Sequence, residues 1–210
     1  MRIAGVLLAA GAGRRMGGEK LAAELLPGLP LAAAALRALL SVGLDAVYAV
    51  VRPGPAPQWL RQAAPARAGG PGPTVVACED AERGMAHSLR CGLAKAEEAG
   101  CGAALVWLAD QPFVTAAMAR ALIGAWRSEP RLDYVASGNG TVLTPPVLLA
   151  ASTFPHIARL EGDLGAKRLL ERPGFAGRVL PAEEPERLMD VDTPDALAAA
   201  RRYACRYMSP

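Results

Sequence analysis

Near its N-terminus the chain reads Leu7-Leu-Ala-Ala-Gly-Ala-Gly-Arg-Arg-Met-Gly-Gly-Glu-Lys20, directly after the apolar segment Ile3-Ala4-Gly5-Val6. This order predicts a buried strand that delivers a glycine-rich loop, with Arg14, Arg15 and Lys20, to the carboxyl edge of a sheet. Glycines let backbone N–H groups approach anionic oxygens, and cations neutralise those oxygens. The stretch is therefore typical of a phosphate-binding site.

Two familiar phosphate motifs do not match this loop. The dinucleotide fingerprint needs Gly-x-Gly-x-x-Gly, but Met16 stands three residues after Gly13. The Walker loop needs Gly-Lys-Ser/Thr, whereas Gly18 is followed by Glu19 and Lys20. A glycine-rich turn with incidental arginines stays open as the structural alternative.

Composition sets the broad class of the protein. A chain of 210 residues, 52% hydrophobic and 20% charged, suits one folded domain over residues 1–210. The 23 basic and 20 acidic residues leave a net charge of +3, with no basic run that would indicate nucleic-acid binding. The first apolar run is too short to span a membrane, so we expect a cytoplasmic protein.

The cysteines point to no metal or disulfide framework. Cys78, Cys91, Cys101 and Cys205 include no Cys-x-x-Cys pair. We expect free, mostly buried thiols in a reducing compartment.

Apolar runs alternate with helical stretches, which predicts an α/β protein: a three-layer α/β/α, Rossmann-like fold with a mostly parallel sheet. The expected strands are 3–9, 46–51, 74–78, 103–109 and 134–137. Four helices are expected. The first covers 31–42, and the second begins near Gly84 with Met85, Leu89 and Leu93 on one face. The third runs from its cap Thr115 to Trp126, and the fourth runs from Pro194, capped by Thr193, to about Tyr203. The Gly/Pro/Ala stretch 53–73 is expected to be a surface connection.

Such sheets bind ligands beyond the carboxyl ends of their strands. Asp110 follows the fourth apolar run, where a carboxylate suits a hard cation such as Mg²⁺ together with substrate phosphates. Asp190 and Asp192 precede the last helix and lie on one side of the chain if the segment is extended. A capping or turn role is the alternative for each of these carboxylates.

Two helix starts are further candidates. The helix that begins near Gly84 offers unpaired N–H groups for a base or ribose, and Ser88 adds a donor and an acceptor. A packing helix with a glycine for close approach is the alternative. Asp163 is a candidate N-cap with Lys167 and Arg168 behind it, a pattern that suits an anionic acceptor but also a solvated helix face. His87 is assigned no catalytic role.

Taken together, these segments resemble the MobA-like nucleotidyltransferases, and most closely the molybdenum cofactor cytidylyltransferase branch. The resemblance spans residues 3 to about 200 and rests on five motifs: Leu8-Ala9-Ala10-Gly11-x-Gly13-x-Arg15-Met16-Gly17 with Lys20, Gly84-Met85-x-x-Ser88-Leu89-x-x-Gly92-Leu93, Asp110-Gln111-Pro112-Phe113, Gly162-Asp163-x-Gly165-Ala166, and Asp190-x-Asp192-Thr193-Pro194.

The resemblance implies a fold of the nucleotide-diphospho-sugar transferase type and the Mg²⁺-dependent transfer of CMP from CTP to the phosphate of a molybdopterin-type cofactor, with release of pyrophosphate. It implies a molybdenum hydroxylase or its chaperone as partner. Relatives that use GTP resemble Leu-Ala-Gly-Gly at the start of the loop, so Ala10 favours CTP. The implied site residues are Arg15, Lys20 and Asp110 for catalysis; Leu8, Ala9, Ala10, Gly11, Gly13, Arg15, Lys20 and Ser88 for the nucleotide; Asp110 and Asp192 for the metal; and Gln111, Asp163 and Lys167 for the acceptor.

The residue types fit this chemistry independently of the family. An acceptor phosphate attacks the α-phosphorus of a nucleoside triphosphate without a protein nucleophile, so the enzyme must supply alignment and charge. The chain has two histidines and no Gly-x-Ser-x-Gly elbow.

Several other functions stay open at this stage. A guanylyltransferase acting on the same cofactor and a nucleotidyltransferase acting on sugar or alditol phosphates use the same chemistry. A chaperone that holds the molybdenum cofactor for insertion is the non-enzyme alternative. A nicotinamide-dependent oxidoreductase, suggested by Arg52 after the second strand, lacks the third glycine of its fingerprint.

Overall fold

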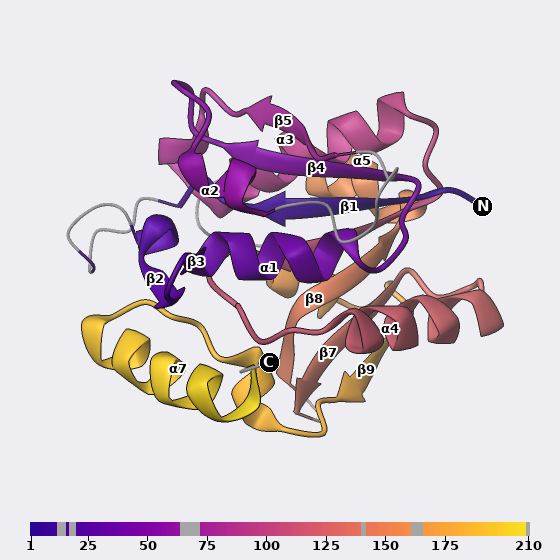
Figure 1. Cartoon of the computed structure of the whole chain (residues 1–210). Helices are drawn as coiled ribbons and strands as arrows, with labels where there is room; N and C mark the ends of the chain where they lie inside the picture. The colour runs from indigo at the N-terminus through magenta and orange to yellow at the C-terminus, as the bar shows by residue number, and fades with distance from the viewer. Residues whose placement is uncertain (12–15, 17–19, 64–71, 140–141, 161–165, 209–210) are drawn as a thin grey trace.

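The computed structural model describes residues 1–11, 16, 20–63, 72–139, 142–160 and 166–208. Within these ranges a seven-stranded sheet has the order β5-β4-β1-β6-β8-β7-β9 (Figure 1). Strand β8 runs antiparallel to β6 and β7, and the other neighbouring strands are parallel. The strands are β1 (Ile3–Leu8), β4 (Ala46–Val51), β5 (Thr74–Ala77), β6 (Ala103–Leu108), β7 (Tyr134–Asn139), β8 (Val142–Ala150) and β9 (Gly177–Pro181).

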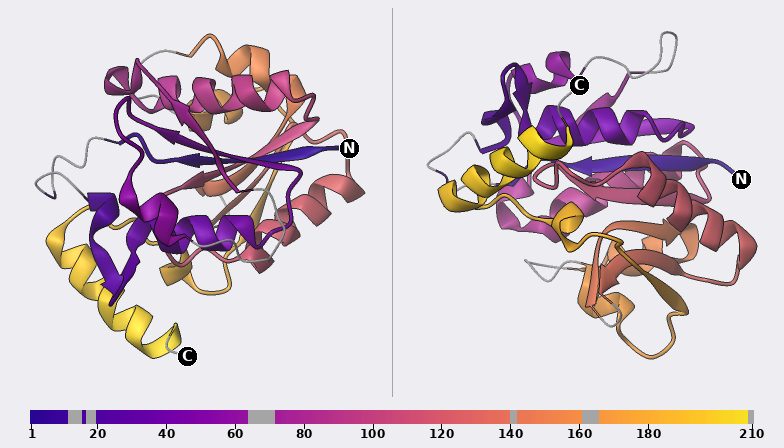
Figure 2. Two further views of the ribbon diagram at one scale, coloured as in Figure 1. Left: turned by 45° about the horizontal axis from the view of Figure 1, so that its top comes forward. Right: turned by 60° about the horizontal axis from the view of Figure 1, so that its bottom comes forward.

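Helices cover both faces of the sheet, as the left view of Figure 2 shows. In β1, Ile3 and Leu7 pack toward one hydrophobic cluster while Ala4 and Val6 pack toward the other, as strand alternation requires. The first face carries α1 (Leu31–Leu40), α2 (Gln58–Gln62) and α4 (Ala116–Ser128), and the second carries α3 (Met85–Glu98), α5 (Phe154–Ile157) and α6 (Ala166–Leu170). The predicted three-layer α/β/α fold is confirmed. None of the described helices is long and apolar enough to cross a membrane.

A third cluster attaches the last helix to the start of the chain. Helix α7 (Pro194–Tyr207) packs on a small hairpin of β2 (Glu24–Leu26) and β3 (Leu29–Pro30). Arg201 Nε donates to the Glu24 carbonyl at 2.9 Å, and the Phe113 and Tyr203 rings lie 4.5 Å apart. This packing holds the segment before α7 close to the segment after the glycine loop.

The five expected strands are confirmed to within two residues, and so are the caps of two helices. Thr115 Oγ1 accepts from the Met118 N–H, and Thr193 Oγ1 accepts from the Ala196 N–H. Helix α7 continues four residues beyond the expected Tyr203, because its apolar positions pack on the hairpin to Ala204.

Strand β8 is absent from the sequence predictions because Pro145 and Pro146 argue against an inner strand. In the structure, a local irregularity in strand pairing accommodates the two prolines. The register of β7 with β8 shifts between Ala136 and Ser137, so both prolines stand in an irregularity, and β8 pairs with β6 only from Val147 onward.

Two expectations need correction. Met85 is 48% exposed and lines the pocket described below, whereas Leu89 and Leu93 are buried, so Met85 does not belong to the buried face of α3. The stretch 53–73 is not only a surface connection. It contains α2, whose Trp59 is 3% exposed because it packs under α1; residues 64–71 lie outside the described ranges.

Candidate active site

A pocket of about 530 Å³ opens at the carboxyl ends of β1, β4 and β6. Segments from six parts of the sequence form its wall, as expected for a sheet of this topology. The lining residues are Leu8, Ala9, Ala10, Gly11, Lys20, Leu21, Arg52, Ala81, Glu82, Gly84, Met85, Ser88, Leu108, Asp110, Asp190 and Asp192.

Lys20 lies between two carboxylates in this pocket. Its Nζ is 2.6 Å from Asp110 Oδ2 and 2.6 Å from Asp192 Oδ1. Lys20 is 9% exposed. Burial lowers the pKa of its ammonium, but the charges and hydrogen bonds of Asp110 and Asp192 outweigh this, and the pKa is raised above its ordinary value. Lys20 is therefore positively charged at neutral pH.

Backbone hydrogen bonds fix the segments that carry these side chains. The Ala9 N–H donates to the Val50 carbonyl at 2.9 Å, and the Ala109 N–H donates to the Leu8 carbonyl at 3.1 Å, which extends the sheet beyond the ends of the strands. The Val191 N–H donates to the Asp110 carbonyl at 3.0 Å. This last bond joins the end of β6 to the 190–192 segment, so Asp110 and Asp192 face one another although they are distant in sequence.

Arg52, the first residue after β4, contributes a second cation. Its Nε donates to the Ala10 carbonyl at 3.0 Å. The Arg52 side chain also lines the pocket. Ala10 itself is 2% exposed because its methyl group packs into the second hydrophobic cluster. The loop therefore presents backbone rather than the Ala10 side chain to the pocket.

Helix α3 begins at the pocket without a side-chain cap. Its N-cap Gly84 has φ +124°, a conformation that favours glycine. Gly92 lets the helix approach the sheet, because a Cβ there would lie 2.3 Å from Val6 Cγ1. The alternative of a glycine for close packing thus holds for Gly92, while Gly84, Met85 and Ser88 line the pocket.

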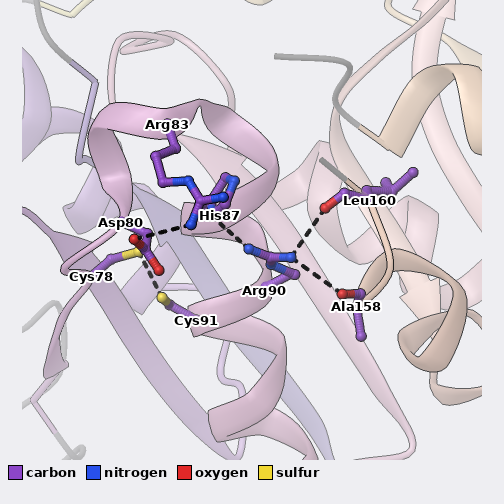
Figure 3. A network of polar contacts seen from close by, with 8 residues as sticks. All are labelled: Cys78, Asp80, Arg83, His87, Arg90, Cys91, Ala158 and Leu160. Carbon is purple, nitrogen blue, oxygen red and sulfur yellow. Dashed lines mark hydrogen bonds and ion pairs between the residues drawn. The ribbon is translucent and has the colours of Figure 1, made fainter. Parts of the chain in front are cut away.

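Further contacts fix α3 on its other side (Figure 3). Arg90 bonds His87 Nδ1 and donates to the Ala158 and Leu160 carbonyls. His87 is 3% exposed and contacts Arg90, so it belongs to the packing of α3.

Acidic side chains outnumber basic ones among the described residues of the pocket wall. Of the described lining residues, Glu82, Asp110, Asp190 and Asp192 are acidic, and Lys20 and Arg52 are basic. Partial desolvation raises the pKa of the Asp190 carboxyl although the residue is exposed, and the negative charge of Asp110 raises it further. Over these described residues an anionic ligand would meet more negative than positive side chains, and a metal ion bound with it would offset the difference.

The donor set of Asp110 and Asp192 fits Mg²⁺, which binds through one or two carboxylates plus phosphate oxygens. Within the described ranges no three His, Cys, Asp or Glu side chains form a metal cluster by themselves. The remaining ligands of a metal at this site would therefore come from substrate and water.

The structure brings most of the predicted nucleotide and metal residues into this one pocket. They are Leu8, Ala9, Ala10, Gly11, Lys20, Ser88, Asp110 and Asp192. Gly13, Arg15 and Asp163 lie outside the described residues.

Two expected acceptor residues do not line the pocket. Gln111 is fully buried; its Nε2 donates to the Leu188 carbonyl at 3.4 Å and its Oε1 has no hydrogen-bond partner. In this position Gln111 supports the 188–190 segment, since its side chain also hydrogen-bonds the Asp190 carboxyl. Its role in acceptor binding stays a prediction. Lys167 is exposed on α6, with its Nζ 3.9 Å from Glu171 Oε1.

Arg52 and Glu82 are charged residues of the pocket that the sequence patterns did not assign to nucleotide binding. The signal for Arg52 was present, because it immediately follows a predicted strand, as Ala9 and Asp110 do. Glu82 precedes the predicted Gly84 turn in the same way.

Comparison with known proteins shows which family this chain resembles. Residues 5–178 match the model of the MobA-like NTP transferase domain. The purine catabolism protein PucB of Bacillus subtilis (strain 168) is 37% identical over 200 residues, which cover 94% of this chain and 95% of PucB.

Solved structures agree with this match. Rv0371c of Mycobacterium tuberculosis H37Rv superposes with a TM-score of 0.78 at 27% identity, over 96% of this chain and 98% of Rv0371c, and it has also been solved in complex with manganese. Molybdopterin-guanine dinucleotide biosynthesis protein A of Archaeoglobus fulgidus shares the fold, with a TM-score of 0.65 at 17% identity over 97% and 99% of the two chains.

Proposed function

The chain belongs to the MobA-like NTP transferase domain family, and we propose that it transfers CMP from CTP to the phosphate of a molybdopterin-type cofactor and releases pyrophosphate. The observation that carries this proposal is the position of Lys20 between Asp110 and Asp192, in the same pocket as the end of β1 and the start of α3.

The residues of the pocket supply charge and alignment. Lys20 keeps its proton at neutral pH and is the described cation nearest to the two carboxylates. We assign it to the triphosphate, together with Arg15 and the N–H groups of the glycine loop. Placing charges in advance where negative charge develops is the largest single contribution in many enzymes.

Mg²⁺ would be held by Asp110 and Asp192, where it would neutralise the phosphate oxygens and the departing pyrophosphate. The excess of carboxylates on the described pocket wall supports the need for such an ion. The manganese complex of Rv0371c supports a divalent metal in a protein of this fold.

We place the nucleoside between the Ala9–Gly11 backbone and the first turn of α3. Ser88 is 5% exposed and lines this end of the pocket with Gly84. Arg52 would offer its terminal N–H groups to the base, where the adjacent O2 and N3 acceptors of cytosine match a pair of donors. The Watson–Crick edge of guanine has a single acceptor, O6, beside the N1–H and N2–H donors, so this edge lacks two adjacent acceptors. This match, with Ala10 in the loop, supports CTP over GTP.

The acceptor and the partner are the finer parts of the proposal. Asp163 and Lys167 remain candidates for the acceptor side, while the buried Gln111 is a support residue. The name of PucB associates that relative with purine catabolism. We propose that the product of this chain serves a cytoplasmic molybdenum hydroxylase or the chaperone that loads it.

A nucleotide panel tests this function. The purified protein is incubated with Mg²⁺, molybdopterin-type cofactor and each of CTP, GTP, UTP and ATP, and pyrophosphate is measured. We expect release with CTP. Release with GTP alone would move the protein to the guanylyl branch, and release only with a sugar or alditol phosphate as acceptor would replace the cofactor. Retention of the cofactor without turnover would identify an insertion chaperone.

A further inference from the structure

The thiols of Cys78 and Cys91 face one another next to the pocket. Cys78 directly follows β5, and Cys91 lies on α3 (Figure 3). The Cys91 thiol donates to Cys78 Sγ at 2.6 Å, and both cysteines are free. The two sulfur atoms therefore belong to different elements that are held in direct contact.

Both sides of this contact are fixed by other interactions. The Cys78 N–H donates to the Val51 carbonyl at 2.9 Å, which continues the sheet, and the Ala81 N–H donates to the Cys78 carbonyl at 3.2 Å. On α3, Arg90 binds the carbonyls of Ala158 and Leu160. A bond between the sulfur atoms thus requires little movement of either element.

The thiol pair also touches a pocket residue. The side chain of Ser88 hydrogen-bonds the Cys78 thiol, and Ser88 stands one turn before Cys91 on the same face of α3. Ser88 lines the pocket, and so do Ala81, Glu82 and Gly84, which connect Cys78 to α3. A change at Cys78 therefore reaches both the side chain and the backbone of the proposed nucleoside site.

We propose that Cys78 and Cys91 form a reversible disulfide when the protein meets a peroxide, and that this modification weakens nucleotide binding. The second part rests on the proposed function, whereas the first does not.

The chemistry balances with a peroxide as the oxidant. The Cys91 thiol gives up its proton, and the thiolate attacks one oxygen of the O–O bond and becomes a sulfenic acid. The other oxygen takes up that proton and leaves as an alcohol or water. The Cys78 sulfur then attacks the Cys91 sulfur, the S–O bond breaks, and the hydroxyl leaves as water with the Cys78 proton. The two thiols lose two hydrogen atoms and the peroxide is reduced.

Accessibility assigns the order of the two steps. Cys78 is fully buried, and burial and then its contact with Cys91 raise the pKa of its thiol to about 12. Cys91 is partly exposed. The oxidant therefore meets Cys91 first, and Cys78 completes the bond.

The expected effect on binding is moderate. The contact with Ser88 lowers the pKa of the Cys78 thiol, so the Ser88 hydroxyl donates to the Cys78 sulfur. A disulfide sulfur is a weaker acceptor for this bond, and the new link also fixes the first turns of α3 to the end of β5. Loss of one hydrogen bond corresponds to roughly threefold to tenfold in affinity.

The test treats the whole chain with hydrogen peroxide, removes the peroxide, blocks the remaining thiols and locates the linked peptides by mass spectrometry. Binding of CTP with Mg²⁺ is measured before oxidation, after oxidation and after dithiothreitol. We expect a Cys78–Cys91 link, weaker CTP binding, and recovery on reduction. Cys91→Ala should abolish both the link and the response, whereas the matched variant Cys205→Ser, at an exposed cysteine away from the pair, should retain both.

Two results would overturn the proposal: no Cys78–Cys91 link in the oxidised chain, or a link that leaves CTP binding unchanged. Failure of the reduced protein to bind CTP would instead contradict the proposed function, because the link is read by mass and not by activity.

Discussion

Lys20 and Lys167 lie in opposite surroundings, although the sequence predicts an anionic partner for both. Lys20 is almost fully buried and contacts Asp110 and Asp192, which are 90 and 172 residues away in the chain. Lys167 is exposed, and its neighbour Glu171 stands four residues later, directly after the end of α6. An exposed pair of the second kind is worth at most about 1 kcal/mol. The comparison teaches that the fold, and not residue type, determines which lysine is buried between carboxylates in the pocket and which stays on the surface.

Of the substitutions that test the difference between the two lysine sites, replacement of Asp110 should lower activity the most. Asp110→Ala removes a proposed metal ligand and leaves Lys20 paired only with Asp192. We expect kcat for pyrophosphate release to fall by about 10²-fold or more. A thermal unfolding transition close to that of the wild type serves as the control for folding. A fully active variant would remove Asp110 from the metal site.

Removing the cation should impair both activity and stability. Lys20→Met leaves two facing carboxylates without their shared partner, so we expect a loss in kcat of about 10²-fold. We also expect the free energy of unfolding at neutral pH to fall by roughly 1–3 kcal/mol, below the cost for a fully buried pair because Asp192 is about half exposed. Urea denaturation measures the second effect. Unchanged stability with lost activity would mean that Lys20 acts on substrate alone.

Arg52→Ala tests the base-reading assignment with a smaller expected effect. Loss of the contact to the Ala10 carbonyl and of donors to the base should raise KM for CTP by about tenfold, since hydrogen bonds to charged groups contribute roughly 1.5–3 kcal/mol. The preference for CTP over GTP should fall with it, while kcat changes little. Initial rates with both nucleotides measure this, and an unaltered CTP/GTP ratio would exclude Arg52 from base selection.

Asp190→Asn should change the pH dependence of stability. The folded pKa of Asp190 is raised above its ordinary value of 3.8, so its ionisation disfavours the folded state. The variant should be slightly more stable than the wild type at neutral pH, and the difference should vanish as the pH falls below 3.8. Urea midpoints across this range provide the measurement; a difference that grows toward acid pH would reverse the assigned sign.

Lys167→Met should have the smallest effect on stability, and it is the matched control for Lys20→Met. Its surface pair contributes little, so the free energy of unfolding should change by less than about 1 kcal/mol. The KM for CTP should be unchanged. A raised KM for the acceptor alone would support Lys167 in acceptor binding, and a raised KM for CTP would contradict the contrast between the two lysines.

The sequence predicts those parts of the fold that depend on local patterns. The runs at β4 and β6 are continuously apolar because both faces of the sheet are covered. Thr115 and Thr193 are caps that a few residues suffice to define. Strand β8 escapes prediction because Pro145 and Pro146 mimic a loop, and the irregularity that accommodates them depends on pairing with β7.

The candidate site was predictable only in its components. Each carboxylate follows an apolar run or precedes a helix, which the sequence displays. The contact of Lys20 with both carboxylates requires the Val191–Asp110 backbone bond and the packing of α7 on the hairpin after Lys20. Neither interaction has a local signal. The burial of Gln111 is hidden for the same reason, because it depends on packing against the 188–190 segment, which is distant in sequence.

The most direct test of the Lys20 site is pyrophosphate release from CTP as Mg²⁺ is titrated, with wild type and Asp110→Ala measured side by side. Two carboxylates that hold the metal predict saturable activation by Mg²⁺ in the wild type and almost no activation in the variant. Turnover that is independent of Mg²⁺, or the same Mg²⁺ response in both proteins, would contradict the account.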